Sequence, residues 1–308
     1  MLVATNGLVV NQFGQVLLIR RDDTRTWALP GGMLEAGELP PEGAAREVGE
    51  ETGLQVTPAR LVGLSFWSDT GDDYLVFIFR CLPGGGELAA SEESPDLGFV
   101  PPTILPRTFY GLHRRRLAQG LAHTGGPPEW FRQQPSLALK VWRRVVGPLV
   151  YLWKDRQRRR LGLPPYSLPP RWTVGAFVII SDEQDRVLWV RRTDQDIWNL
   201  PGGQVETGEA PWEAAVRETK EETGLDVRLT DLSGVYVKPA NDGLILTFTA
   251  AVSGGQLRIG PEAAAFDYFK PGEEPANSLA KQVVRAADAF NRRGTVIYRR
   301  QPATKSPA

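Results

Sequence analysis

The sequence is poor in the residues on which several classes of protein depend. Its 308 residues include one cysteine and two histidines, which excludes an intramolecular disulfide and leaves few ligands for a zinc site. Positive and negative side chains number 36 each, so no overall field attracts nucleic acid or an anionic membrane. No apolar run reaches the roughly 18 residues that a membrane-spanning helix needs, and no signal-peptide pattern is present. We therefore expect a soluble, cytoplasmic protein.

What the sequence does contain is one unusual string written twice. WALPGGMLEAGE occupies Trp27–Glu38, and WNLPGGQVETGE occupies Trp198–Glu209. Laid over each other without a gap, Trp27–Leu54 and Trp198–Leu225 agree at 18 of 28 positions. A match of this length, which also continues upstream and downstream, indicates a duplicated domain rather than a solenoid of short repeats.

Each copy combines short aliphatic runs, typical of strands, with a glycine-rich loop and helix-forming stretches, which is the pattern of an α/β domain. We expect the first domain at residues 1–120 and the second at residues 171–295, with closing helices near Phe109–Leu121 and Asn277–Phe290. Between them, residues 121–170 form a proline-rich, basic linker that contains helix. The composition of residues 296–308 predicts a disordered tail.

The linker has a strong local charge. Lys140–Arg160 contains eight basic residues and one acid, Asp155, in helix-forming stretches that we expect to be interrupted at Gly147–Pro148. Tryptophan and tyrosine among the basic residues leave open a membrane-surface or nucleic-acid site. The simpler interpretation is a helix that packs its apolar side on one domain and leaves its arginines in solvent.

After the repeated string, both copies predict the same short helix. Pro40 and Pro211 suit the first turn of a helix, and Gly53 and Gly224 suit the residue just past its end. In such a helix three glutamates stand at i, i+3 and i+4, on one face. They are Glu47, Glu50 and Glu51 in the first copy and Glu218, Glu221 and Glu222 in the second.

These glutamates are unfavourably placed. Three neighbouring carboxylates repel one another, and they stand towards the C-terminal end of the helix, where the dipole disfavours negative charge. One arginine per copy, Arg46 or Arg217, relieves only part of this. A solvated acidic face would explain a lone cluster, but the same violation repeated in register indicates a functional site. Clustered carboxylate oxygens suit Mg²⁺ or Mn²⁺.

The full spacing, Gly-x5-Glu-x7-Arg-Glu-U-x-Glu-Glu-x-Gly-U with U a bulky aliphatic residue, resembles the Nudix box. The first copy fits from Gly32 to Leu54, and the second, from Gly203 to Leu225, departs once, with Thr219 at the first U position. We expect that position to face the sheet, so threonine weakens packing there mildly. The resemblance implies two α-β-α sandwich domains in tandem, each with a mixed sheet and the box as a loop-helix-loop. It implies Mg²⁺-dependent hydrolysis of a nucleoside diphosphate linked to another moiety.

The resemblance also implies roles for single residues. The six box glutamates hold metal, and the carbonyl of Gly32 or Gly203 adds a ligand. Arg46 and Arg217 orient the neighbouring glutamates through charge-assisted hydrogen bonds. Both copies keep every acidic position of the box, so we expect both to be active.

Residues outside the box complete the expected site. The family often uses a later loop carboxylate as metal ligand or general base; the candidates are Glu92 or Glu93 and, in the second copy, Glu262, which the repeat pairs with Glu93. A solvated loop glutamate is the alternative. Arginines that end a strand before the glycine loop either meet substrate phosphates or lie exposed at a sheet edge. They are Arg20, Arg21, Arg191 and Arg192.

The substrate is left open. Residues that mark the ADP-ribose, dinucleoside polyphosphate, coenzyme A and NADH subfamilies are absent or out of position, so sugar nucleotides, ADP-ribose and free nucleoside triphosphates all stay possible. One alternative function is removal of pyrophosphate from RNA 5′ ends, with the basic linker gripping the strand. Another is a nucleotide-sensing regulator with little hydrolysis. Because duplicated halves resemble a dimer of single domains, we also expect an internal pseudo-dimer.

Overall fold

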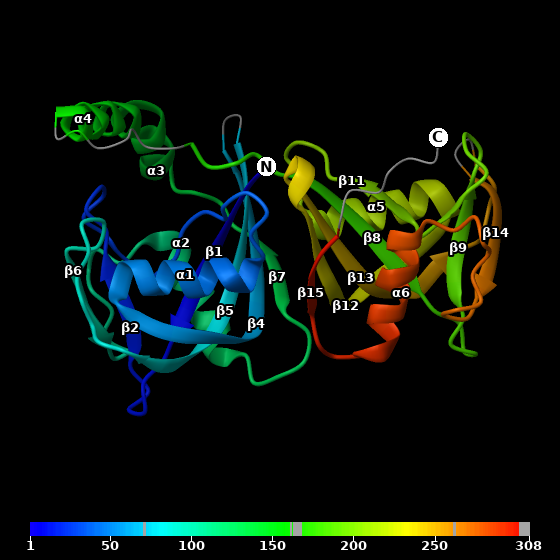
Figure 1. The fold of residues 1–308 in the computed structure, drawn as a ribbon, viewed down its shortest axis with the longest axis horizontal. Helices are drawn as coiled ribbons and strands as arrows, with labels where there is room; N and C mark the ends of the chain where they lie inside the picture. Colours follow the sequence, from blue (N-terminus) through cyan, green and yellow to red (C-terminus); the bar gives the residue numbers. More distant parts are fainter. Residues whose placement is uncertain (70–71, 161, 163–167, 261–262, 302–308) are drawn as a thin grey trace.

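The computed structural model describes residues 1–69, 72–160, 162, 168–260 and 263–301. Figure 1 shows two halves of the same architecture side by side. The first half contains β1 (Leu2–Val9), β2 (Val16–Arg20), β3 (Trp27–Ala28), α1 (Pro40–Thr52), β4 (Leu54–Asp69), β5 (Asp72–Gly86), β6 (Asp96–Val100), α2 (Gly111–Ala122) and β7 (Glu129–Arg132). A helical segment follows, made of α3 (Leu137–Val141), the π-helical turn η1 (Trp142–Val146) and α4 (Gly147–Arg160).

The second half repeats the order of the first, with β11 and the turn η2 in addition. It contains β8 (Thr173–Ile180), β9 (Val187–Arg192), β10 (Trp198–Asn199), β11 (Gly202–Gln204), α5 (Pro211–Thr223), β12 (Leu225–Lys238), the 3-10 turn η2 (Pro239–Asn241), β13 (Gly243–Gly255), β14 (Ala263–Phe269), α6 (Ala280–Asn291) and β15 (Ile297–Arg300). No helix among the described residues is long and apolar enough to cross a membrane.

Each half has a large mixed sheet and a small antiparallel one. The large sheet of the first half has the order β1-β5-β4-β7, with β1 parallel and β4 antiparallel to β5. That of the second half has the order β11-β8-β13-β12-β15, with β8 parallel and β12 antiparallel to β13. The small sheets are β3-β2-β6 and β10-β9-β14. The mixed sheets are as predicted.

Two helices cover opposite faces of each large sheet. Side chains alternate along β1, so Val3 packs in one cluster with Val48 of α1, whereas Leu8 packs in another with Leu117 of α2. Helices α5 and α6 flank β8 in the same way. The predicted α-β-α sandwich is therefore confirmed for both halves.

Helices α1 and α5 begin and end where the sequence predicts. Each starts at its proline and stops before a glycine in the left-handed region, Gly53 with φ of 75° and Gly224 with φ of 78°. Glycine adopts this conformation without a steric penalty. Thr219, the one departure from the box pattern, is fully buried, and its hydroxyl donates to the carbonyl of Ala215 at 2.7 Å. Its polar group is thus satisfied within the packed face.

Two short strands lie outside the expected domain boundaries. β7, in the segment interpreted as linker, pairs with β4, and β15 pairs with β12. The prediction of a disordered tail is therefore wrong for Ile297–Arg300, while residues 302–308 lie outside the described residues. Four-residue strands that contain charged residues carry too little periodicity to be recognised from sequence.

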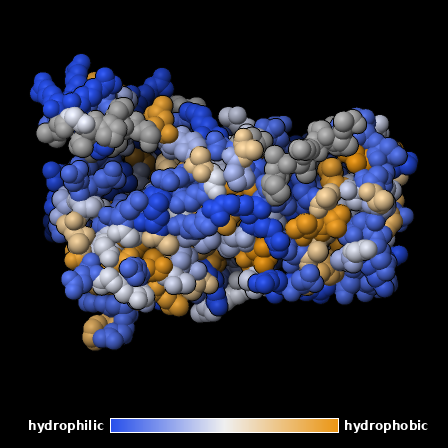
Figure 2. Space-filling model, viewed as in Figure 1, coloured by the Kyte–Doolittle hydropathy of each residue, from blue (hydrophilic) through white to orange (hydrophobic). Residues whose placement is uncertain are grey.

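The linker helix is continuous rather than interrupted. The π-helical turn lies directly before Gly147 and Pro148. A proline ring crowds the carbonyl four residues earlier, and a wider turn relieves this without ending the helix. Several of its apolar side chains, such as Val145 and Leu149, are exposed, so the expectation that its apolar side packs on one domain is only partly correct. In Figure 2 hydrophilic side chains dominate the visible surface over α4.

The two halves meet through reciprocal contacts. Arg132 of β7 pairs with Glu213 of α5, and Arg300 of β15 pairs with Glu42 of α1. The two glutamates are equivalent in the repeat, and so are the strand positions opposite the arginines. Each arginine also donates to a carbonyl in the glycine-rich loop of the other half, that of Gly208 at 2.7 Å and that of Gly37 at 3.0 Å.

Aromatic contacts follow the same symmetry. Trp130 of β7 packs on Phe248 of β13 with ring centroids 5.7 Å apart, and Tyr298 of β15 packs on Phe79 of β5 at 5.8 Å. Residues from both halves form one hydrophobic cluster around these rings. The halves therefore share a core as well as ion pairs.

We expect the aromatic contact, rather than the ion pair, to stabilise the junction. Trp130→Ala removes a large apolar ring and should lower the free energy of unfolding by ~2–4 kcal/mol. Arg132→Ala, the control on the same strand, removes an exposed ion pair and should cost less than ~1 kcal/mol. Urea denaturation of the full chain measures both. Equal, small effects would mean that the shared cluster contributes little.

Candidate functional site

Arg46 of α1 organises the first glutamate cluster. Its Nε and Nη2 donate to the two carboxylate oxygens of Glu38 at 2.8 and 3.0 Å, and its Nη1 donates to Glu47 at 2.9 Å and to Glu50 at 3.0 Å. Nη2 also donates to the carbonyl of Met33 at 3.0 Å. A planar guanidinium presents its donors in a fixed fork that suits such a set of acceptors. The arginine thereby joins the helix to the glycine-rich loop.

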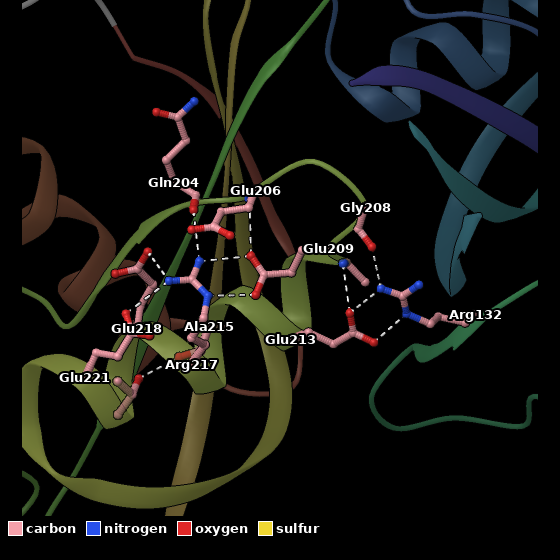
Figure 3. Close-up of polar contacts among 12 residues, drawn as sticks. Arg132, Gln204, Glu206, Gly208, Glu209, Glu213, Ala215, Arg217, Glu218 and Glu221 are labelled. Carbon is pink, nitrogen blue, oxygen red and sulfur yellow. Dashed lines mark hydrogen bonds and ion pairs between the residues drawn. The ribbon is translucent and has the colours of Figure 1, made fainter. Parts of the chain in front are cut away.

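The second half repeats these contacts (Figure 3). Arg217 donates to both oxygens of Glu209 at 2.9 Å, to Glu218 at 3.0 Å, to Glu221 at 3.1 Å and to the carbonyl of Gln204 at 3.3 Å. The orienting contacts expected of the two arginines are thus present in both halves, and each arginine brings two of the three helix glutamates together.

The third glutamate of each set faces the glycine loop. The N–H of Gly31 donates to Glu51 at 2.7 Å, and that of Gly202 donates to Glu222 at 2.8 Å. Both glutamates are 7% exposed. These carboxylates are therefore fixed in position by the loop backbone.

The next glycine of each loop leaves room for a carboxylate. A Cβ added at Gly32 would lie 2.4 Å from an oxygen of Glu47, and one at Gly203 would lie 2.5 Å from the carboxyl carbon of Glu218. Any other residue would displace the glutamate. The carbonyl of Gly32, expected as a metal ligand, accepts a hydrogen bond from the N–H of Thr5 at 2.9 Å, so one of its lone pairs remains for a ligand.

The inner carboxyl groups of the first half carry shifted pKa values. Burial raises the pKa of Glu47 to about 7, opposed by the nearby Arg46. Burial also raises the pKa of Glu51 to about 8, opposed by the Gly31 N–H and reinforced by the charge of Glu47. A buried carboxylate without a full counter-charge is unfavourable. A bound cation would lower the pKa of both Glu47 and Glu51.

The donor set fits a hard divalent cation in chemistry, because all of its side-chain ligands are carboxylate oxygens. Among the described residues, no three His, Cys, Asp or Glu side chains converge on one metal position. Glu50 is turned towards Arg46, and 61% of its side chain is exposed. An exposed side chain changes rotamer at little cost, so a three-carboxylate set requires Glu50 to leave Arg46.

Of the later-loop candidates, Glu93 approaches the first cluster. Its side chain is exposed, yet its charge contributes to the raised pKa of both Glu47 and Glu51. Glu262 lies outside the described residues.

Two of the four strand-end arginines are held by a carboxylate two residues further on. Arg21 donates to Asp23 at 2.9 and 2.7 Å, and Arg192 donates to Asp194 at 2.8 and 2.9 Å. The charge of Arg21 also opposes the rise in the pKa of Glu51. Arg21 therefore lies on the site side of its strand.

Their neighbours form looser pairs. Arg20 lies 3.9 Å from Asp96, and Arg191 lies 3.7 Å from Asp196. Successive strand residues point to opposite faces. This arrangement favours the exposed-edge interpretation for Arg20 and Arg191.

A buried polar cluster near the first site was not recognised in the sequence. Arg116 of α2 is 4% exposed and donates to Gln133 and to Asn6, both at 3.0 Å. His113, one turn earlier on the same helix, accepts from the N–H of Leu29 at 3.0 Å. The repeat could have indicated this cluster, because the second copy has an arginine, Arg285, at the position equivalent to Arg116.

One family and several known proteins are similar to this chain. The family described as NUDIX domain matches residues 2–119 and 171–290. A "MutT-like protein" of Streptomyces ambofaciens is 38% identical over 123 residues, 40% of this chain and 79% of the relative. An "ADP-ribose pyrophosphatase" of Methanocaldococcus jannaschii is 37% identical over 139 residues, 43% of this chain and 78% of the relative. The crystal structure of an ADP-ribose pyrophosphatase from Streptococcus suis aligns over 41% of this chain and 98% of its own, with 23% identity and a TM-score of 0.36.

Each of these matches spans about one half of the chain, whereas the NUDIX family matches both halves. Each half places the arginine and glutamates of its box in the same hydrogen-bonded arrangement. The chain belongs to the Nudix hydrolase family and carries two NUDIX domains in tandem.

Proposed function

We propose that both domains hydrolyse the pyrophosphate linkage of nucleoside diphosphate derivatives, giving a nucleoside monophosphate and the second phosphorylated product. The observation that carries this proposal is the network of Arg46, built a second time around Arg217. A domain that had lost activity would be expected to lose part of this network. Both halves retain all of its hydrogen bonds.

The proposed metal is Mg²⁺, with Mn²⁺ as a substitute. Each domain binds its own ion. The ligands are Glu47, Glu50, Glu51 and the carbonyl of Gly32 in the first domain. In the second they are Glu218, Glu221, Glu222 and the carbonyl of Gly203. When bound, the ion offsets charge on the diphosphate and lowers the pKa of the attacking water. The chain's own residues do the positioning: Arg46 and Arg217 hold the glutamates, and Arg21 contacts substrate phosphate.

Two further roles are part of the proposal. Glu93, whose charge reaches the inner carboxylates, serves as metal ligand or general base in the first domain, and Glu262 does so in the second. Arg192 contacts phosphate in the second domain as Arg21 does in the first, since both are held by equivalent aspartates.

The substrate is a small nucleotide, as the family implies. The name of the Methanocaldococcus jannaschii relative, ADP-ribose pyrophosphatase, places ADP-ribose among the compounds to test. We also propose that the halves form an internal pseudo-dimer, which the reciprocal pairs of Arg132 and Arg300 support. Removal of pyrophosphate from RNA 5′ ends stays an alternative because α4 carries exposed arginines such as Arg156 and Arg160.

The main test is turnover in Mg²⁺ of a panel containing ADP-ribose, sugar nucleotides, nucleoside triphosphates and triphosphorylated RNA. Glu50→Gln and Glu221→Gln each remove one ligand from one domain, and each should lower kcat at its own centre by at least about 100-fold. The double variant should be inactive. Glu87→Gln, an exposed glutamate outside the box, is the matched control and should keep full activity.

The pattern of loss separates the alternatives. A stepwise fall that ends at zero supports two working centres. Loss through one single variant alone would make the other domain non-catalytic for that substrate. Cleavage of RNA only, with binding that weakens steeply as salt rises, would favour the RNA alternative. Binding without turnover of any compound would contradict the proposed hydrolysis.

A second prediction concerns the buried carboxylate of Glu51. Without metal and above about pH 8, where the Glu51 carboxyl is ionised, its charge lacks a full counter-charge, so Glu51→Gln should raise Tm by about 2–4 °C in EDTA. The same variant should lose most of the Tm increase that Mg²⁺ gives the natural chain. Glu50→Gln is the control, because this exposed carboxylate should leave Tm in EDTA unchanged. Thermal unfolding followed by circular dichroism at constant pH measures all three proteins, and destabilisation by Glu51→Gln in EDTA would contradict the prediction.

A further inference from the structure

A cavity of about 830 Å³ opens on the glycine loop of the first domain. This volume suits a nucleotide-sized ligand. Gly31, Gly32 and Arg21 line the end nearest the catalytic cluster, and His113 and Arg116 line another part. The cavity therefore connects the proposed phosphate site to the buried polar cluster of α2.

Two hydrogen-bond donors in this cavity face each other. The N–H of Leu29 donates to Nδ1 of His113, and burial, with the nearby Arg116, holds the pKa of His113 well below its usual range. A neutral imidazole that accepts at Nδ1 carries its hydrogen on Nε2. This Nε2 lies 3.2 Å from Nη1 of Arg116, which is also a donor. Among the described residues, none accepts the Nε2 hydrogen, so an acceptor oxygen from a ligand would complete the pair.

Arg116 adds a buried positive charge to the same place. It hydrogen-bonds to the neutral side chains of Gln133 and Asn6, and within the described chain no carboxylate forms an ion pair with it. A buried cation without an anion is costly. An electron-rich oxygen brought by a ligand would offset part of that cost.

The helical segment 137–160 closes the other side of the cavity, with Trp142, Arg143 and Tyr151 among its lining residues. Arg143 fastens the segment to the first domain. Its guanidinium lies 4.8 Å from the ring centre of Trp67 and 4.4 Å from that of Tyr74, and it donates to the Tyr74 hydroxyl. The rings of Trp67 and Tyr74 are themselves stacked, 4.0 Å apart.

The second domain differs at the equivalent positions. Gln282 stands where the first domain has His113, and its Oε1 accepts from Arg285 at 3.0 Å. Phe177 stands in place of Asn6, and its ring centre lies 5.2 Å from the Arg285 guanidinium. The strand pair opposite, Trp67 and Tyr74 in the first domain, is Lys238 and Gly243 in the second. In the second domain Gln282 thus accepts from the Nη1 donor that faces His113 in the first, although Nε of Arg285 has no hydrogen-bond partner among the described residues.

We propose that the cavity is a base-binding pocket whose His113 and Asn6 have no identical counterpart in the second domain, that the helical segment closes it, and that it takes a nucleobase with a carbonyl oxygen facing Arg116 and His113. This deepens the proposed function by assigning the two catalytic centres different nucleotides. An amino group at the same ring position is itself a hydrogen-bond donor, so it could not accept from Arg116 or from His113. Bases with a carbonyl there are therefore selected over bases with an amino group.

Inosine and adenosine monophosphate are suitable probes, because their bases differ chiefly in a carbonyl or an amino group at one ring carbon. Neither contains a pyrophosphate, so binding is measured on the intact chain without turnover, by isothermal titration calorimetry. The tighter site should bind inosine monophosphate at least about tenfold more strongly than adenosine monophosphate. His113→Gln should bring the ratio close to one, since glutamine accepts from the arginine in the second domain.

Arg143→Ala should weaken binding of both nucleotides by a similar factor, because it loosens the closing segment and leaves His113 and Arg116 in place. Arg144→Ala, an exposed arginine on the next residue, is the matched control and should change neither affinity. The presence of glutamine beside the buried arginine in the second domain indicates that His113→Gln folds, and circular dichroism checks this.

Equal affinities for the two nucleotides, or a preference that survives His113→Gln, would overturn the proposal. An effect of Arg144→Ala as large as that of Arg143→Ala would overturn the role of the closing segment. Hydrolysis in the panel assay is measured separately, so loss of the base preference with hydrolysis intact rejects this inference alone.

Discussion

In both domains one guanidinium holds together a helix, a loop and carboxylates that repel one another. Arg46 and Arg217 each make five hydrogen bonds, four of them to carboxylate oxygens. Hydrogen bonds between charged groups contribute roughly 1.5–3 kcal/mol each, whereas the repulsion on the helix surface amounts to tenths of a kcal/mol per pair. The larger cost is burial, which the raised pKa of Glu51 shows is not fully offset. The arginine offsets enough of the negative charge for the cluster to form in the folded protein. The net negative charge that remains attracts a cation.

The box helices α1 and α5 also take part in the contacts between the domains. Glu213, the ion-pair partner of Arg132, stands one turn before Arg217 on α5. Figure 3 shows the Arg132–Glu213 pair next to the network of Arg217. Glu42 and Arg46 have the same relation on α1. Each box helix therefore makes a contact with the other domain through one of the reciprocal pairs. A single chain with both copies keeps this geometry independent of protein concentration, which a dimer of separate domains does not.

The sequence was informative where a residue type is dictated by local backbone or charge. Gly53 and Gly224 ended the box helices as expected, because only a left-handed residue caps them there. Spacing also brought the box arginines and glutamates together. The sequence was uninformative where partners are distant: β7 and β15 are too short for a period, and Arg116 meets Asn6 from 110 residues away. The continuous linker helix was missed because a π-helical turn before Pro148 has no sequence signature.

The two domains agree most closely where phosphate chemistry constrains them and differ where a base would lie. A change to a box glutamate that pairs with the box arginine leaves that arginine with an unpaired donor and, in the proposed function, the cation with fewer ligands. The cluster near α2 is different, because a neutral side chain there has more than one way to be satisfied. Gln282 accepts from Nη1 of Arg285 and Phe177 packs against its guanidinium, whereas in the first domain Nη1 of Arg116 and Nε2 of His113 face each other beside a cavity. A closing segment that lines this cavity, fastened through Arg143, adds a second difference without altering any box residue. Divergence of substrate in a duplicated hydrolase is thus physically easiest at this position, with the arginine–glutamate network of the box kept intact in both copies.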